Sequence, residues 1–455
     1  MERSSEQKII LLMDYYNKGS QDLVDSFKNA GLDFQAVVIN DEGFLPDDVI
    51  NVFEFYLGDF SEKNQKPRYF NQIEVPDFWE VSGNNTSGSI HDKSRERGRI
   101  FYAEPKNKRF VKVVDWLDEA GNVRLSEHYN KYGCKYALTT FNKKSQKVNK
   151  SYFDVEGREV ITENYVTNDI VLNIDGKILI FKNRTEFVKY FICSQNWQGN
   201  RIFFNSLSVP FFVSNALEDV SGDRGDILFW QENVGAEIPG NMQVIFDKKT
   251  SRCHRVIVQN RQAFKRLKDL KAPKDMISEM GFIYSFKREN LGRPSALICT
   301  NTENVEKLRE LLEELPMVKF HVTALTEMSA KLLSHEQYEN VIMYPNVKMV
   351  TLDRLFTECD FFLDINHEGE IVEATRRAFF NNQVIFAFKE TIHSLEYIAD
   401  ENVYLSNDYK QLAGHIKSLL DSKEALDKAV RKQHEQGLAA EKSDYIFLMT
   451  VNSSE

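Results

Sequence analysis

Apolar runs that alternate with helical spacing constrain this fold more than any other feature of the sequence. Residues 8–13 include an unbroken apolar run, which is typical of a strand buried on both faces of a parallel sheet. Leu23, Val24 and Phe27 then recur at helical spacing, and Gly31 is placed to end that helix as its C-cap. Residues 35–39 form a second apolar run. Together these segments predict a βαβ unit, the opening of a doubly wound domain.

The pattern changes over residues 61–199, where short runs rich in Val, Ile, Tyr and Phe lack helical spacing. Turn signals separate the runs, for example at residues 119–122, 156–158 and 175–177. A segment of roughly 130 residues is too long to be a loop. We therefore expect an antiparallel β-sheet module inserted into the first α/β domain.

Alternating strands and helices return after Asn200 and again after Pro273. Residues 201–204, 226–230 and 242–246 are predicted strands that complete the first domain. Later predicted strands cover residues 296–299, 319–322, 341–343, 361–363 and 384–387, and the tail over 408–440 is predicted to be helical. The chain is thus expected to be an α/β protein with a first domain in two parts, 1–60 and 200–272, an inserted module, 61–199, and a second domain, 273–455.

A basic stretch lies at the boundary between the two α/β domains, over residues 248–271. Its cations include Arg252, Arg255, Arg261, Lys265, Arg266 and Lys268. The ordinary interpretation is a solvated helix face followed by a linker. A patch for anionic lipid or for a protein partner is the alternative.

Charge and cysteine usage exclude several classes of protein. A formal charge of -10 argues against generic nucleic-acid binding. The five cysteines are scattered without a Cys-x-x-Cys pair, as in a protein whose thiols stay reduced. No segment approaches the roughly 18 apolar residues of a membrane span. We expect a cytoplasmic protein, and the basic stretch leaves peripheral contact with the membrane open.

Residues 361–387 carry the most informative candidate site, a predicted strand, polar turn, helix and strand in succession. The turn and the helix start hold Asn366, His367, Glu368, Glu370 and Glu373. Acids at a helix start usually complement the helix dipole, and contact with a ligand is the alternative. His367 could act as a base, although a lone loop histidine is more often solvated or bonded to a neighbour.

A second candidate site is the loop after the first strand, Asn17, Lys18, Gly19 and Ser20. Such a loop could cradle a phosphate at a helix N-terminus, while an ordinary capped turn is the simpler interpretation. The sequence has no cluster with zinc spacing, no Gly-x-Ser-x-Gly elbow and no Walker loop. It therefore predicts no metal and no other cofactor.

The whole layout resembles the GT-B glycosyltransferases, which pair two Rossmann-type domains. In particular, the chain is similar to the glycosyltransferase-stabilising subunits of the bacterial O-linked N-acetylglucosamine (O-GlcNAc) transferase pair that modifies serine-rich-repeat adhesins before accessory Sec export. The resemblance covers essentially the whole chain. It rests on the layout, on residues 14–19, 136–141 and 154–158, and on the helix start at Glu373 and Ala374.

Donor chemistry in this architecture has requirements that this sequence does not meet. The resemblance implies an Arg and a Lys at the end of the first strand of the second domain, which neutralise the diphosphate leaving group. Asn301 and Asn304 stand at the matching positions. It also implies two glutamates separated by seven residues. With Glu373 at the second position, the first falls on Ile365. Glu368 and Glu370 lie too close to Glu373 to replace it.

The resemblance therefore implies a non-catalytic subunit without a cofactor. Such a subunit stabilises a partner O-GlcNAc transferase and binds the adhesin polypeptide for O-glycosylation in the cytoplasm. The acceptor would lie in an interdomain groove, with the residues of both candidate sites as contacts. Partner-interface candidates are five aromatic residues of the β module that could instead fill its core, Trp79, Phe101, Tyr102, Trp116 and Phe153.

The competing hypothesis is an active UDP-sugar-dependent transferase with rearranged donor contacts. In that case Lys287, Arg288 or Arg293 would bind the diphosphate. This hypothesis predicts measurable binding of a UDP-sugar by the isolated chain.

Overall fold

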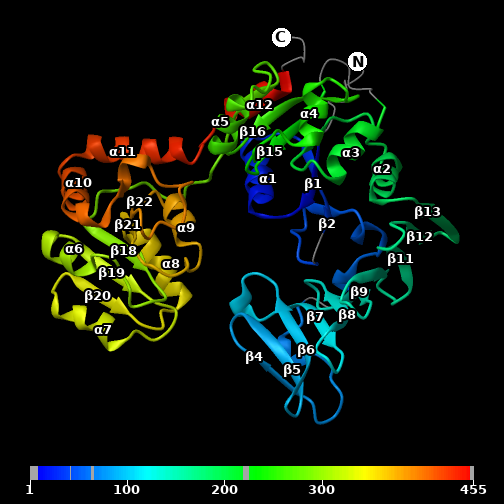
Figure 1. Cartoon of the computed structure of the whole chain (residues 1–455), viewed down its shortest axis with the longest axis horizontal. Helices are drawn as coiled ribbons and strands as arrows, with labels where there is room; N and C mark the ends of the chain where they lie inside the picture. The colour runs from blue at the N-terminus through cyan, green and yellow to red at the C-terminus, as the bar shows by residue number, and fades with distance from the viewer. Residues whose placement is uncertain (1–8, 41–42, 63–65, 219–224, 451–455) are drawn as a thin grey trace. The chain divides into compact units, whose positions relative to one another are not determined.

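The computed structural model describes residues 9–40, 43–62, 66–218 and 225–450 of the 455-residue chain (Figure 1). The chain divides into two compact units. The first unit comprises residues 1–279 and 445–455, and the second unit comprises residues 280–444. Lys8, with which the first predicted strand begins, lies outside the described residues.

The first unit contains a seven-stranded sheet in which every neighbouring pair is parallel. Its strands are β1 (Ile9–Tyr15), β2 (Phe34–Asn40), β3 (Val49–Asn51), β14 (Ile202–Phe204), β15 (Asp226–Trp230), β16 (Cys253–Val258) and β17 (Ile277–Glu279). The strand order is β17-β16-β15-β14-β1-β2-β3. The chain order reverses between β1 and β14, so the topological switch point lies there.

The predicted βαβ opening is confirmed. Helix α1 (Lys18–Ala30) connects β1 to β2 and ends at Gly31, whose φ of 74° is the left-handed C-cap conformation that glycine adopts easily. Further helices of this unit are α2 (Arg184–Ser194), α3 (Val209–Ala216), α4 (Gly240–Phe246) and α5 (Arg261–Asp269), and α12 (Lys442–Thr450) begins at the end of the second unit and continues into this one.

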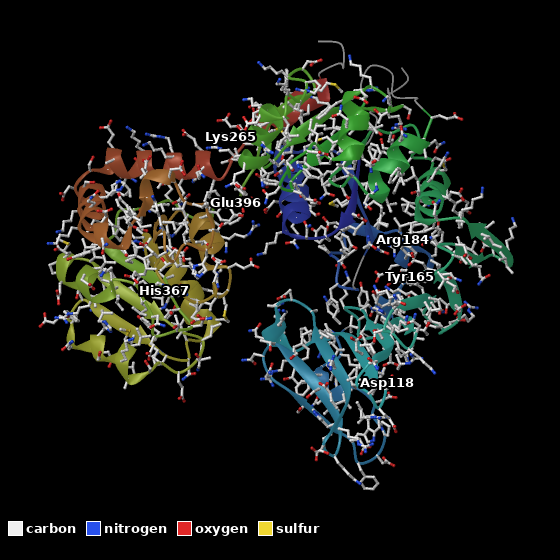
Figure 2. All side chains as sticks on the ribbon, in the orientation of Figure 1. Asp118, Tyr165, Arg184, Lys265, His367 and Glu396 are labelled. Atoms are coloured by element: carbon white, nitrogen blue, oxygen red, sulfur yellow. The ribbon has the colours of Figure 1, made fainter. Side chains whose placement is uncertain are left out.

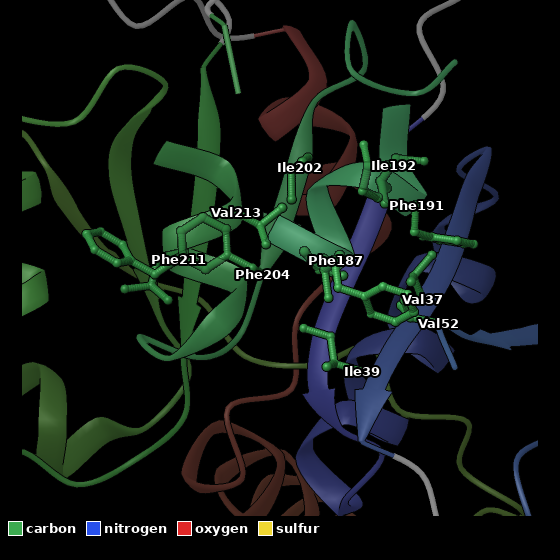
Figure 3. Packing of buried hydrophobic residues seen from close by; sticks show 14 of the residues in the cluster. Val37, Ile39, Val52, Phe187, Phe191, Ile192, Ile202, Phe204, Phe211 and Val213 are labelled. Atoms are coloured by element: carbon green, nitrogen blue, oxygen red, sulfur yellow. The ribbon is translucent and has the colours of Figure 1, made fainter. Parts of the chain in front are cut away.

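A large apolar core lies on one face of this sheet and extends into the β module (Figure 3). Phe187 and Phe191 of α2 pack there with Val37 of β2 and Phe204 of β14. Residues in such a core typically contribute ~1.5–3 kcal/mol each when an aliphatic or aromatic side chain is fully buried. The core thus holds α2, which follows the last strand of the β module, against strands formed at both ends of the first α/β domain.

The predicted strand over residues 242–246 is wrong, because this segment is helix α4. Pro239 precedes the helix, and Met242, Ile245 and Phe246 are buried. Their i, i+3, i+4 spacing puts all three on one helical face. A five-residue apolar run is ambiguous between strand and helix, and here the helical spacing decides.

The interpretation of residues 248–271 as a solvated helix face plus linker holds for α5 but is wrong for residues 252–258. Strand β16 occupies its middle, and Arg252 is fully buried. The Arg252 guanidinium forms an ion pair with Asp226, with 3.0 Å between Nη2 and Oδ1, and donates hydrogen bonds to the carbonyls of Gln198 and Asn200. Arg252 is therefore part of the core and cannot belong to a surface patch.

The inserted module is a ten-stranded antiparallel meander, as predicted, with the strands in sequence order from β4 to β13. They are β4 (Glu80–Gly83), β5 (Ser87–Asp92), β6 (Arg95–Tyr102), β7 (Val111–Leu117), β8 (Val123–Tyr129), β9 (Lys135–Phe141), β10 (Lys147–Phe153), β11 (Glu159–Asn164), β12 (Ile170–Ile174) and β13 (Lys177–Phe181). Tyr136, Tyr152 and Ile161 belong to the same core as Phe187, so the β9–β13 end of the sheet packs on the first α/β domain. The β4–β7 end has a smaller core of its own.

The second unit has a six-stranded parallel sheet in the order β20-β19-β18-β21-β22-β23. Its strands are β18 (Ser295–Cys299), β19 (Lys319–Thr323), β20 (Val341–Tyr344), β21 (Phe361–Asp364), β22 (Val384–Phe388) and β23 (Val403–Tyr404). Its helices are α6 (Leu308–Glu314), α7 (Ala330–Leu333), α8 (Met349–Glu358), α9 (Ala374–Phe380), α10 (Tyr409–Asp421) and α11 (Lys423–Gln436). Two apolar clusters contain alternate residues of β18, such as Ile298 and Leu297, so both faces of this sheet are covered. The tail that was predicted to be helical contains two helices, α10 and α11.

Candidate functional site

The turn after β21 lies at the switch point of the second sheet, where the chain order reverses between β18 and β21. Asn366 is buried there and donates from Nδ2 to the Glu368 carbonyl at 3.0 Å. The His367 ring, labelled in Figure 2, hydrogen-bonds through Nε2 to the Glu306 carboxylate at 2.7 Å. The His367 backbone N–H donates to the Asn304 carbonyl at 3.1 Å. The turn is thus fastened to the segment that follows β18.

The three acids of this turn are exposed. Glu370 accepts hydrogen bonds from the backbone N–H of Thr375, at 2.7 Å, and from the Thr375 hydroxyl. It therefore satisfies a donor in the first turn of α9, as the dipole interpretation expects. Glu373 precedes α9 in the left-handed conformation, with φ at 54°.

A buried carboxylate that sequence reasoning missed fixes the shape of this turn. Asp364, the last residue of β21, accepts from His393 Nδ1 at 2.5 Å and from the His393 backbone N–H at 2.8 Å. His393 Nε2 reaches the Glu368 carbonyl at 2.5 Å. The hydrogen bond to Asp364 raises the pKa of His393 to about 9. His393 is therefore an imidazolium at neutral pH, bridging Asp364 and the candidate turn.

Raising the pH is expected to weaken this bridge. The pKa of His393 is about 9 in the folded chain and 6.5 in its ordinary state, so the folded chain binds this proton more tightly. The resulting stabilisation is complete below pH ~6.5 and is lost as the pH rises through ~9. We expect wild type to melt higher than His393→Gln at about pH 6, and this gap to shrink by about pH 9.5. Melting temperatures of both proteins at the two pH values test this, and a constant gap would contradict it.

The positions at which donor chemistry would need charge are neutral or buried. Asn301 and Asn304 are exposed in the turn after β18, and this turn is held by Thr300 and Thr302. Neutral amides do not offset the charge of a leaving diphosphate. Ile365 is fully buried among apolar residues of the second unit. A glutamate at position 365 would therefore enter the core.

The cations named in the competing hypothesis lie at the amino ends of the strands, opposite the candidate turn. Arg288 and Arg293 both pair with Asp360, with 2.5 Å between Arg288 Nη1 and Oδ1 and 2.8 Å between Arg293 Nη2 and Oδ1. Asp360 is buried and directly precedes β21, at the amino end of the strand. Lys287 lies on the same segment and donates its backbone N–H to the Phe380 carbonyl. Ligands of open parallel sheets bind at the carboxyl ends of the strands. The contacts of these cations at the amino ends therefore indicate a structural role.

In the first unit, residues 17–20 form a capped turn. Asn17 Oδ1 accepts from the Ser20 backbone N–H at 2.9 Å, and the Ser20 hydroxyl donates to the Tyr15 carbonyl at 2.6 Å. Lys18, the first residue of α1, is exposed. Gly19 allows close packing, because a Cβ there would lie 2.4 Å from Gln231 Oε1. The capped-turn interpretation is confirmed.

A row of amides joins this turn to the ends of three neighbouring strands. Asn205, Gln231 and Gln259 directly follow β14, β15 and β16. Asn205 Nδ2 donates to the Ser20 hydroxyl at 2.9 Å, and Gln231 Nε2 donates to the Gly19 carbonyl and to Gln259 Oε1, both at 3.0 Å. Sequence reasoning missed this row, although residues that follow parallel strands always meet at one sheet edge. Its chemistry suits neutral polar groups such as peptide amides and hydroxyls.

The aromatic candidates of the β module differ in exposure. Tyr102 is 3% exposed and fills the core of the module, as the alternative interpretation expected, so we remove it from the surface candidates. Trp79 and Trp116 are half-buried against the same core, and Phe153 is half-buried as well. Phe101 is 43% exposed. Sequence reasoning missed the apolar pair Ile178 and Ile180 on β13, which are 69% and 70% exposed.

Two absences hold for the part of the chain that the structure describes. No group of three or more His, Cys, Asp or Glu side chains in these residues could hold a metal ion. No helix among them is long and apolar enough to cross a membrane.

Four domain families match successive parts of the chain. They are described as the GtfB N-terminal domain over residues 10–56, the GtfB middle domain over 79–182, the GtfB third domain over 184–270 and the GftB/GlyA-F C-terminal domain over 296–433.

Curated relatives match over nearly their full length. A protein of Streptococcus agalactiae is 42% identical over 91% of this chain and 93% of its own. One of Streptococcus gordonii is 40% identical over 93% of this chain and 94% of its own. Both are named UDP-N-acetylglucosamine–peptide N-acetylglucosaminyltransferase stabilizing protein GtfB.

Solved structures agree with these matches. A chain in the crystal structure of a GtfA/B complex bound to UDP and GlcNAc superposes with a TM-score of 0.90 at 39% identity, over 96% of this chain and 98% of the other. The structure of TarM superposes with a TM-score of 0.51 at 14% identity, over 98% of this chain and 99% of the other, which shows the fold alone. The predicted GT-B-like fold class is confirmed, with two parallel α/β sheets and a large antiparallel insertion.

Proposed function

The chain belongs to the GtfB family of UDP-N-acetylglucosamine–peptide N-acetylglucosaminyltransferase stabilizing proteins, and from this premise we propose that it is a non-catalytic subunit that stabilises a partner O-GlcNAc transferase. The observation that carries the proposal is the distribution of charge in the second unit. Asn301 and Asn304 stand at the carboxyl end of β18 in place of the expected cations. Arg288 and Arg293 form ion pairs with Asp360 at the amino end of the strands. The competing hypothesis of an active UDP-sugar-dependent enzyme thus loses Arg288 and Arg293 as donor contacts.

We further propose that the chain binds the serine-rich-repeat adhesin as an unfolded polypeptide in the cytoplasm, before accessory Sec export. The capped turn of the first unit is one proposed contact region, and the turn after β21 of the second unit is another, each taken by itself. Both turns sit at the switch point of a parallel sheet, which is where such sheets bind ligands. Amides and hydroxyls line the first of them, and these groups match a Ser/Thr-rich backbone. Holding such a polypeptide would present its many serines to the partner at high effective concentration.

The β module over residues 61–199 is the part proposed to bind the partner transferase. Its edge strand β13 exposes Ile178 and Ile180 on one face, and an edge strand offers unpaired backbone groups to another chain. Phe101 lies near the opposite end of the same sheet and adds exposed apolar surface. Burying such apolar area is favourable, so partner binding would also protect this sheet from aggregation.

Peripheral contact with anionic lipid is proposed for α5 alone. Lys265, labelled in Figure 2, and Lys268 lie on the exposed side of this helix, while Ala263 and Leu267 are buried. Clustered lysines attract an anionic surface with about 1 kcal/mol each.

Co-expression of the partner transferase with and without this chain tests the main proposal. We expect soluble transferase and adhesin glycosylation to fall sharply when the chain is absent. The double variant Ile178→Lys, Ile180→Lys should reproduce that loss, because it places charge in the proposed interface. Val350→Lys is the matched control, since Val350 is likewise exposed, on α8 of the second unit. Unchanged transferase yield in the absence of the chain would contradict the proposal.

A further inference from the structure

Asp14 is a carboxylate whose position no established property of the chain explains. It lies near the carboxyl end of β1, beside the switch point between β1 and β14. The residue is 9% exposed, so it is largely shielded from water while part of its surface remains accessible. It belongs to the segment 14–19 on which the family resemblance rests, yet the proposed stabilising role does not use it.

Neutral donors orient this carboxylate. Asn40, the last residue of β2, donates from Nδ2 to Asp14 Oδ1 at 2.7 Å and to the Asp14 carbonyl at 3.1 Å. Ser206, which follows β14, donates its hydroxyl to Asp14 Oδ2 at 3.3 Å. An ionised carboxylate offers about four lone-pair sites and only accepts hydrogen bonds. Asp14 therefore keeps capacity for a further donor.

A chain of contacts from the β module fixes Asn40 in turn. Arg184, at the start of α2, donates from Nη1 to Asn40 Oδ1, which leaves the Asn40 amide nitrogen to face Asp14. The same guanidinium pairs with Glu163 of β11 through Nε and through Nη2, the latter at 2.8 Å. Glu163 is buried. Arg184 is labelled in Figure 2, near Tyr165. A fork of this kind holds its partners in one plane, so Arg184 positions Asn40 and thereby Asp14.

We propose that the Asp14 carboxylate selects hydroxyl-bearing side chains in the bound polypeptide, by accepting a hydrogen bond from a serine or threonine. Arg184 is the positioning residue, and Glu163 ties this recognition group to the β module. The proposal rests on the proposed function, in which the chain binds an unmodified serine-rich polypeptide. Its chemistry excludes phosphorylated acceptors, because two anions at this site repel one another.

Isothermal titration of the full chain with a synthetic serine-rich peptide tests the proposal, together with a peptide of the same length in which alanine replaces serine. We expect wild type to bind the serine peptide at least ~10-fold more tightly, since a hydrogen bond to a charged group supplies that much discrimination. Asp14→Asn should bring the two affinities within about twofold. Asp33→Asn is the matched control, because Asp33 precedes β2 at the opposite edge of the same sheet, and it should keep the discrimination.

Arg184→Lys is the second variant, because it keeps a cation for Glu163 but loses the fork that holds Asn40. We expect its discrimination to fall while its melting temperature stays near that of wild type, a split that a merely structural role would not produce. Wild type that binds both peptides equally would overturn the proposal and leave the proposed function standing. Failure to bind either peptide would overturn both. Tighter binding of a lysine-bearing peptide than of the serine peptide would make Asp14 a cation site and also overturn the proposal.

Discussion

The Arg252→Met variant is expected to lose about 3–5 kcal/mol of stability, because removing one partner of a buried ion pair leaves the other charge unpaired in the core. The side chains of Arg252 and Asp226 are both 0% exposed, with 3.0 Å between Nη2 and Oδ1. The Arg252 guanidinium also donates to the carbonyls of Gln198, at 2.8 Å, and Asn200, at 2.5 Å. In the variant these three acceptors lose their donor, and water reaches them too poorly to replace it. A loss of this size is a large fraction of the usual stability of a domain.

Tryptophan fluorescence during urea unfolding measures this loss in the right part of the molecule. All four tryptophans, Trp79, Trp116, Trp197 and Trp230, lie in the first unit together with Arg252. Arg158→Met is the control, because Arg158 pairs with Asp154 at 2.8 Å on an exposed turn. The control should unfold at nearly the wild-type urea concentration, since exposed pairs contribute little. Equal midpoints for both variants would show that Arg252 does not hold the core.

The Gly281→Ala variant is expected to destabilise the second unit by about 3 kcal/mol or more, because a side chain at this position must displace backbone atoms. A Cβ on Gly281 would lie 1.5 Å from the Leu438 carbonyl oxygen and 2.5 Å from its carbonyl carbon. The two segments are paired here. Phe282 donates its N–H to the Leu438 carbonyl at 3.0 Å, and Ala440 donates to the Phe282 carbonyl at 2.8 Å. The variant must break this pairing to fold.

Hydrogen exchange at the amides of Phe282 and Ala440 reports on the Gly281 variant directly. Their protection should drop in Gly281→Ala, and the melting temperature should fall with it. Gly414→Ala is a control of opposite sign, because Gly414 lies in α10 and a Cβ there would meet no atom of the described residues within 4 Å, apart from its own helix backbone and chain neighbours. Alanine in an exposed helix interior is expected to stabilise by about 0.5–1 kcal/mol. Normal protection in Gly281→Ala would contradict the account of this contact.

Strong local signals carried the fold prediction. The apolar run of β1, the spacing of Leu23 and Phe27, and Gly31 as a C-cap together predicted the first βαβ unit correctly. Two predictions of secondary structure failed, because the local pattern was weak or misleading. The segment with Met242 is too short for its period to be obvious, and it folded as a helix. Strand β16 was not predicted, because Arg252, His254 and Arg255 make this segment look too polar for a buried strand. The charge of Arg252 is neutralised by Asp226, which is distant in sequence.

The candidate site shows the same division between local and tertiary information. The turns that hold Asn17 and Glu370 were predictable, because caps and helix starts are decided by neighbours in sequence. The pairing of Asp364 with His393 spans 29 residues, and no local pattern indicates it. The amides after β14, β15 and β16 could have been found by reading the residue that follows each predicted strand.

Transfer of GlcNAc from UDP-GlcNAc to a serine-rich polypeptide tests the central claim most directly. Three samples are compared, which are the isolated chain, the partner transferase alone and the two together. We expect no transfer by the isolated chain, since Asn301 and Asn304 provide no charge for the diphosphate, and faster transfer by the pair than by the partner alone. Transfer by the isolated chain above the level of a protein-free blank would contradict the account.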